Sequence, residues 1–225
     1  MGIVESLAFF PPAGLVGRQE LRFAMERDGE MVKDFWLTTG AGVRVPALHF
    51  ERGSPKQTIL FCHGNAVDVG IIFRWLRRLS DVTNSRVIAV EYPGYMDSYK
   101  KSSIASASEE SQLHSAATPS ESGCFAAGLA GLQYLVEEVK VPQTEIVFMG
   151  RSLGTGPTME ISYKQENCKA TVLLSPLISA IRTKFPFLAY TPAAFDDIFD
   201  SSWKAPRISS PTLIVHGDKD KVVPW

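Results

Sequence analysis

The chain has 225 residues, 45% of them hydrophobic and 21% charged, and its formal net charge is -1. This length and composition predict one globular domain with a sizeable hydrophobic core. Acidic and basic residues are interspersed along the chain, which excludes the basic surface that nucleic-acid binding requires. The three cysteines are too few and too widely separated for a disulfide framework or a zinc site, so a reducing compartment is favoured.

The N-terminus offers one candidate modification site. No apolar run reaches the ~18 residues of a membrane span, and residues 1–17 lack the basic start and apolar core of a secretory signal. The run Met1-Gly2-Ile3-Val4-Glu5-Ser6 satisfies the pattern for attaching myristate to Gly2, the alternative being an unmodified, frayed terminus. A single myristoyl chain anchors weakly. The sequence therefore predicts a cytoplasmic protein with, at most, peripheral contact with the cytosolic face of a membrane.

After an N-terminal segment at 1–32, hydrophobic patterning predicts a single α/β domain over residues 1–225. Lys33–Thr39 and Val43–Phe50 are β-rich runs joined by glycines, which predicts an antiparallel hairpin at a sheet edge. Short β-branched apolar runs then alternate with segments of helical period, as in a mostly parallel sheet with helices on both faces. The expected strands are Thr58–Cys62, Arg86–Tyr92, Glu145–Met149, Ala170–Ser175 and Thr212–His216, and the expected helices are Val67–Ser80, Cys124–Val139 and Thr155–Glu166.

Two segments interrupt this alternation. Residues 96–122 are rich in serine and poor in large apolar side chains, which predicts a surface insertion, either a passive loop or a site of regulatory phosphorylation. Residues 178–206 lie where a small cap is expected, and their aromatic side chains either line an acyl-chain groove or pack onto the sheet. These aromatic residues are Phe185, Phe187, Tyr190, Phe195, Phe199 and Trp203.

The pentapeptide Gly150-Arg151-Ser152-Leu153-Gly154 closes the predicted strand Glu145–Met149 and opens a predicted helix. A bare Gly-x-Ser-x-Gly pattern is a weak signal, but this strand-turn-helix context is that of a nucleophile elbow. The sharp turn forces the serine into a sparsely allowed backbone conformation, and the glycines let strand and helix approach. Ser152 is therefore the candidate nucleophile.

The candidate partners of Ser152 come from two other loops. The loop after Thr58–Cys62 is expected to form an oxyanion hole, in which the backbone N–H groups of Asn65 and Leu153 face the developing alkoxide. His63, in the same loop, is expected to stabilise the turn by hydrogen bonding. The polar loop after Thr212–His216 carries two carboxylates, of which Asp220 is favoured over Asp218 as the triad acid because it directly precedes an apolar run.

These blocks, in this order, resemble the α/β-hydrolase superfamily, and further blocks resemble the alpha/beta hydrolase domain-containing protein 17 family. They are Leu7-Ala8-Phe9-Phe10-Pro11-Pro12, His63-Gly64-Asn65-Ala66-Val67-Asp68, Glu91-Tyr92-Pro93-Gly94-Tyr95, Thr118-Pro119-Ser120-Glu121 and Leu174-Ser175-Pro176-Leu177 with Arg182. The resemblance, which runs from about Leu7 to Pro224, implies a serine hydrolase that removes palmitate from cysteines of membrane-associated proteins. The family's N-terminal cysteine cluster is absent here.

The resemblance also implies a catalytic histidine roughly thirty residues beyond Asp220, where the fold as expected here lacks its last strand and helix. Of the histidines present, at positions 49, 63, 114 and 216, none is expected to reach both the serine and the acid. A fragment or truncated gene model is favoured over a natural pseudoenzyme.

The sequence thus predicts a serine hydrolase of acyl esters or thioesters, most specifically a palmitoyl-protein thioesterase acting on an S-acylated membrane-associated protein. No metal or organic cofactor is implied. Two alternatives stay open: a catalytically inactive domain that binds an acylated partner through the same pocket, and an esterase or peptidase of the same fold.

Overall fold

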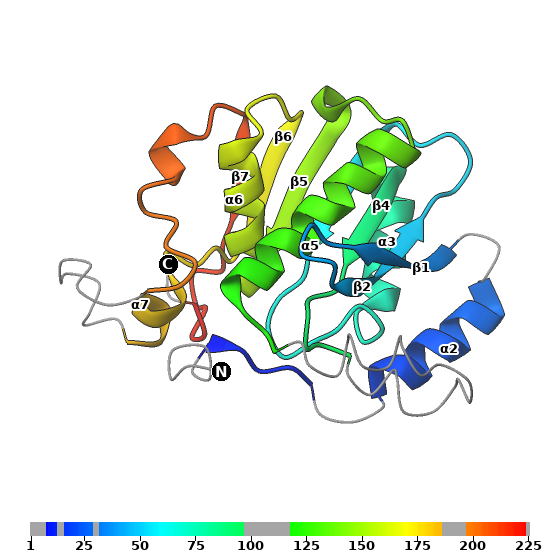
Figure 1. Ribbon diagram of the computed structural model, residues 1–225, viewed down its shortest axis with the longest axis horizontal. Helices are drawn as coiled ribbons and strands as arrows, with labels where there is room; N and C mark the ends of the chain where they lie inside the picture. Colours follow the sequence, from blue (N-terminus) through cyan, green and yellow to red (C-terminus); the bar gives the residue numbers. More distant parts are fainter. Residues whose placement is uncertain (1–7, 13–15, 29–31, 97–117, 186–196, 224–225) are drawn as a thin grey trace.

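A seven-stranded sheet forms the centre of the protein, with strand order β1-β2-β4-β3-β5-β6-β7 (Figure 1). The computed structural model describes residues 8–12, 16–28, 32–96, 118–185 and 197–223. Gly2, most of the serine-rich insertion and the middle of the cap segment therefore lie outside the described residues. β2 runs antiparallel to both of its neighbours, and all later pairings are parallel. The predicted edge hairpin and the mostly parallel sheet are confirmed.

The strands form where short β-branched runs are bounded by polar or glycine-containing turns. They are β1 (Val32–Thr38), β2 (Arg44–Phe50), β3 (Gln57–Cys62), β4 (Ser85–Val90), β5 (Ile146–Arg151), β6 (Ala170–Leu174) and β7 (Thr212–Val215). Every predicted strand is present, with its ends shifted by at most two residues. β3 and β5 lie at the centre of the sheet, so that the residues that follow them emerge at one carboxyl edge.

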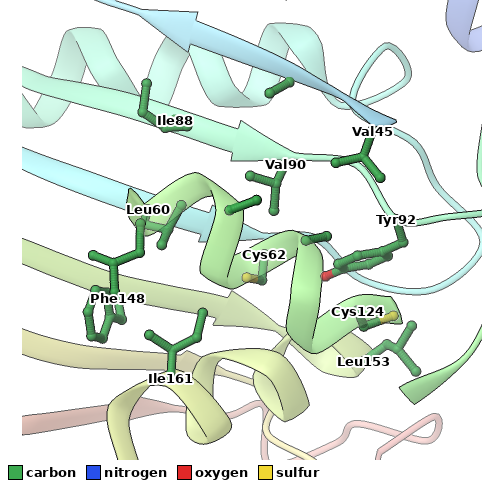
Figure 2. Packing of buried hydrophobic residues seen from close by; sticks show 14 of the residues in the cluster. Val45, Leu60, Cys62, Ile88, Val90, Tyr92, Cys124, Phe148, Leu153 and Ile161 are labelled. Atoms are coloured by element: carbon green, nitrogen blue, oxygen red, sulfur yellow. The ribbon is translucent and has the colours of Figure 1, made fainter. Parts of the chain in front are cut away.

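Helices cover both faces of the sheet. They are α2 (Val16–Asp28), α3 (Phe73–Thr83), α5 (Glu121–Gln133), α6 (Thr155–Lys164) and the short α7 (Ala180–Lys184). Successive strand residues point to opposite faces, so Leu60 packs with Phe148 and Ile161 beneath α5 and α6 (Figure 2). Its neighbours Ile59 and Phe61 pack with α2 and α3 on the other face. Two hydrophobic layers therefore hold the central strands in place.

Three helical boundaries differ from the sequence-based expectations. α2 falls within the segment left unassigned at 1–32, where it buries Leu21 and Ala24 against the layer around α3. α3 begins at Phe73 instead of Val67. α5 begins at Glu121, inside the predicted serine-rich insertion, because the Ser120 hydroxyl caps it by accepting a hydrogen bond from the Gly123 N–H at 3.1 Å. α5 then continues as a π-helical turn, Tyr134–Glu138.

The last strand presents apolar side chains to solvent. Leu213, Ile214 and Val215 are 57%, 59% and 50% exposed. Because successive side chains of a strand point to opposite faces of the sheet, apolar side chains are exposed on both faces of β7. Within the described part of the chain, β7 pairs with β6 and ends the sheet. No helix among the described residues is both long and apolar enough to cross a membrane.

The layer around α3 makes a stability prediction. Leu76 is fully buried in that layer, so Leu76→Ala should lower the free energy of unfolding by about 2–5 kcal/mol through lost burial and a cavity. Val82 lies in the same helix but is 74% exposed, so Val82→Ala should change the free energy of unfolding by less than about 0.5 kcal/mol. Urea denaturation measures both, and equal effects of the two substitutions would contradict the packing described.

Candidate active site

A cavity of about 300 Å³ opens at the carboxyl ends of the parallel strands, the edge where α/β sheets bind ligands. Its polar lining brings together residues from four loops that are far apart in sequence: Asn65 after β3, Ser152 after β5, Ser175 after β6 and Asp220 after β7. Three of these four are residues that the sequence analysis selected. Asp218 is exposed and does not line the cavity.

Ser152 occupies the strained turn that the sequence pattern predicts. Its φ is +50°, in the left-handed region, and a one-turn 3-10 helix at Ser152–Gly154 leads into α6. Both flanking positions must be glycine because neighbouring backbone atoms lie too close for a side chain. A Cβ on Gly150 would lie 2.4 Å from the Gly154 carbonyl oxygen, and one on Gly154 would lie 2.1 Å from the Cys62 carbonyl oxygen. The turn therefore rests directly on the end of β3.

The candidate oxyanion loop lies over this turn. Asn65 lines the cavity, and Leu153 is the residue that follows Ser152 in the turn. A Cβ on Gly64 would lie 3.3 Å from the Arg151 carbonyl oxygen and 3.5 Å from the Ser152 Cβ. The two loops that are expected to supply the oxyanion N–H groups are therefore in direct contact across Ser152.

His63 holds the base of the oxyanion loop through a buried ion pair. Its Nδ1 donates to the Gly64 carbonyl at 2.8 Å, and its Nε2 lies 2.7 Å from Glu91 Oε1, with both side chains fully buried. Glu91 also accepts hydrogen bonds from the Val69 and Tyr92 N–H groups. The Gly64 carbonyl can only accept, so Nδ1 carries a hydrogen, and the charge of Glu91 favours the protonated form of the ring.

The pKa of His63 follows from these contacts. Burial alone lowers the pKa of His63, but the charge and hydrogen bond of Glu91, with the Gly64 carbonyl, raise it above its ordinary value. Tyr92 stacks on the ring at 4.2 Å between centroids and donates from its hydroxyl to the His63 carbonyl. His63 therefore has the structural role expected from the sequence.

Asp220 faces the cavity as an ionised carboxylate. Its Oδ1 accepts the N–H groups of Val222 and Val223, both at 2.9 Å. These two hydrogen bonds, together with the nearby Ser175 hydroxyl, hold the pKa of Asp220 below its usual range. Ser175, which has φ +46°, was missed by the sequence analysis as a partner of the acid. Only its position at the end of a predicted strand could have indicated it.

None of the three described histidines lines the cavity. His49 is buried in the edge hairpin, where it hydrogen-bonds to the Tyr134 hydroxyl and Glu51. His216 lies 3.8 Å from Asp220, but its Nε2 donates to the Val223 carbonyl at 2.7 Å. His63 is held in its ion pair, and His114 lies outside the described residues.

The apolar lining of the cavity comes from the α3 side, from Phe61, Val67, Ile72 and Trp75, and from Val222 and Val223. The described cap aromatics do not line it. Phe199 is fully buried against Phe9 and Phe125, while Trp203 packs edge-on to Tyr163. Phe187, Tyr190 and Phe195 lie outside the described residues. Of the described cap aromatics, Phe199 thus follows the packing alternative of the sequence analysis, whereas Trp203 is 45% exposed.

The strand order, the single antiparallel β2 within the sheet and the strained serine turn after β5 define the α/β-hydrolase fold. The fold is shared with an esterase of Pyrococcus furiosus, with a TM-score of 0.62 and 16% identity, covering 96% of this chain and 80% of that one. No protein-family model matches the chain.

Within this class, the sequence resembles the alpha/beta hydrolase domain-containing protein 17 family. It is 32% identical over 200 residues to human alpha/beta hydrolase domain-containing protein 17C, covering 88% of this chain and 54% of the relative. It is also 36% identical over 166 residues to the Caenorhabditis elegans protein named alpha/beta hydrolase domain-containing protein aho-3, covering 74% of this chain and 44% of the relative. The chain therefore spans about half the length of these relatives.

The buried ion pair predicts a pH-dependent stability difference. A raised pKa of His63 in the folded state stabilises the fold fully below the unfolded pKa of ~6.5, and this stabilisation is lost as pH rises through the folded pKa. Glu91→Gln, which leaves the imidazolium unpaired, should cost about 3–5 kcal/mol near pH 6 and progressively less at higher pH. Urea denaturation of both proteins between pH 6 and 9 measures the difference, and a constant difference would contradict the ionic assignment.

Proposed function

We propose that the protein is a serine hydrolase of acyl esters or thioesters, and specifically a palmitoyl-protein thioesterase. One observation carries the proposal: a serine with φ +50° shares a cavity with an oxyanion loop and an ionised aspartate, each following a different strand of the sheet. In this reaction, the Ser152 hydroxyl attacks the acyl carbonyl, and the N–H groups of Asn65 and Leu153 stabilise the oxyanion. Asp220 orients the histidine that acts as general base.

We further propose that this histidine lies in a segment that follows Asp220 in a longer form of the protein. Two observations support this. None of the described histidines lines the cavity, and the matched part of this chain covers only 44–54% of the relatives' length. The apolar side chains of β7 are 50–59% exposed, which suits them for contact with a further strand.

An acyl chain as the substrate group is supported by the cavity wall. Ile72 and Trp75 line it from the α3 side, and Trp75 packs against Phe61 with ring centroids 5.0 Å apart. A cavity of about 300 Å³ with this apolar wall and a few convergent polar groups is typical of a small-molecule site. The S-acylated protein as substrate rests on the sequence resemblance.

A second candidate function is binding without catalysis. It is favoured because none of the described histidines lines the cavity, and a serine hydroxyl with no general base is a poor nucleophile at neutral pH. Such a domain would bind an acylated partner in the Ser152 cavity. The esterase or peptidase alternative differs from the thioesterase in the leaving group and uses the same residues.

The thioesterase proposal predicts the effect of three substitutions in the full-length protein. Ser152→Ala should lower kcat for a palmitoyl-thioester peptide by on the order of 10⁴–10⁶-fold, and Asp220→Asn by on the order of 10³–10⁴-fold. The control, Asp218→Asn, removes an exposed carboxylate outside the cavity and should leave kcat within about twofold. Release of the free thiol measures each rate.

The outcomes separate the candidate functions. Equal losses in Asp218→Asn and Asp220→Asn would contradict the assignment of the acid. Binding of the acylated peptide without turnover by the wild-type protein would favour the second candidate function, binding without catalysis. Faster hydrolysis of short-chain esters or aminoacyl amides would favour the third alternative.

A further inference from the structure

We propose that residues 8–10, here called the N-terminal strap, position the oxyanion loop through the side chain of Asn65. The strap lies at the carboxyl edge of the sheet (Figure 1) and contacts Asn65, which lines the cavity. It is separated from the oxyanion loop by more than fifty residues of sequence, yet the two are joined by direct hydrogen bonds. The inference rests on the proposed function, because it assigns the strap a role in holding an oxyanion donor.

The Asn65 amide binds the backbone of the strap at two points. Its Nδ2 donates to the Ala8 carbonyl at 2.6 Å, and its Oδ1 accepts the Phe10 N–H at 2.9 Å. The same Oδ1 accepts the Tyr95 hydroxyl at 2.7 Å and the Ala66 N–H at 3.1 Å. Four partners thus fix the side chain, and a fixed side chain restricts how the backbone of Asn65 can rotate.

The oxyanion loop needs this external support. Ala66 has φ +56°, a left-handed conformation that is costly for a residue with a Cβ and persists only where the surroundings enforce it. Its N–H is one of the four partners of the Asn65 side chain. The strap and Tyr95 therefore stabilise the residue that directly follows the candidate oxyanion donor.

The strap also reaches the other half of the site. Phe9 is 3% exposed and packs edge-on against Phe199, with ring centroids 5.8 Å apart. Phe199 in turn lies against Gly156 in α6, where an added Cβ would lie 2.2 Å from the Phe199 ring. Because α6 begins directly after the Ser152 turn, the strap connects the oxyanion loop to the nucleophile helix. It is placed to fix the separation of the two groups that act on one carbonyl.

The effect on turnover should be specific. An error of about 1 Å in the position of a group that acts in the transition state can cost on the order of 10²-fold in rate. The strap does not line the cavity, so binding of the acyl chain along Ile72 and Trp75 should be preserved. A weakened strap therefore lowers kcat and leaves KM nearly unchanged. Asn65 and Phe9 act here as positioning residues.

The test compares Phe9→Ala with Phe23→Ala in the full-length protein. Phe23 lies in α2 and is 70% exposed, so its truncation removes the same side chain without disturbing the strap. We expect Phe9→Ala to lower kcat for a palmitoyl-thioester peptide by roughly 10–10²-fold with KM within about threefold. Phe23→Ala should leave both constants within about twofold. Equal kinetics of Phe9→Ala and the wild-type protein would overturn the proposal.

Hydrogen–deuterium exchange gives a second readout that does not require activity. In Phe9→Ala, amide exchange of residues 62–67 should rise by at least about tenfold, while exchange in β4 and β5 stays as in the wild type. Unchanged exchange at 62–67 would overturn the positioning role of the strap even if the wild-type protein proved inactive. The strap proposal and the thioesterase proposal can therefore fail separately. If Phe9→Ala does not fold, Asn65→Ala replaces it. Protection of the Phe10 amide must then fall together with kcat, and retained protection would likewise overturn the proposal.

Discussion

The close contact between the Ser152 turn and the end of β3 is the constraint on which the rest of the site depends. Gly154 lies so near the Cys62 carbonyl that no side chain fits between them. This contact allows a non-glycine residue with φ +50° to persist at the start of α6. It also brings the loop after β3 over the serine, so a single packing contact positions both the serine turn and the oxyanion loop.

Polar contacts then hold that loop at two levels. Beneath it, the His63–Glu91 pair ties the first loop residues to the end of β4 and to the Val69 N–H, in surroundings where an unpaired charge would be costly. Beside it, the Asn65 amide ties the loop to residues 8–10. Rigid placement of donors before the reaction is the general basis of oxyanion stabilisation, and these contacts supply that rigidity.

The parts of the structure that follow local rules could be predicted from sequence. Short apolar runs indicate the strands, and the glycines on either side of Ser152 indicate the serine turn, because only glycine leaves room for the close backbone contacts there. The start of α3 could not be predicted, because Asp68 accepts the Ile71 N–H and Glu91 accepts the Val69 N–H, contacts that hold residues 67–72 in turns despite their apolar period. Ser120 was read as part of a loop although it caps a helix.

The features of the site that the sequence did not predict are also contacts between residues far apart in the chain. Asn65 was selected for its backbone N–H, but its side chain reaches residues more than fifty positions away, and no local pattern encodes that contact. Ser175 becomes a partner of Asp220 only because β6 and β7 are neighbours in the sheet. Pattern analysis locates residues on elements, whereas the partners of those residues depend on how the elements pack.

The most direct measurement is acid quenching of the full-length protein during turnover of a palmitoyl-thioester peptide, followed by mass spectrometry of its peptides. Nucleophilic catalysis predicts a palmitoyl group on the peptide that contains Ser152, formed within one turnover and lost when substrate is exhausted. Turnover with the acyl group on a different residue, or with no acyl-enzyme under any quench time, would contradict the assignment of Ser152 as the nucleophile.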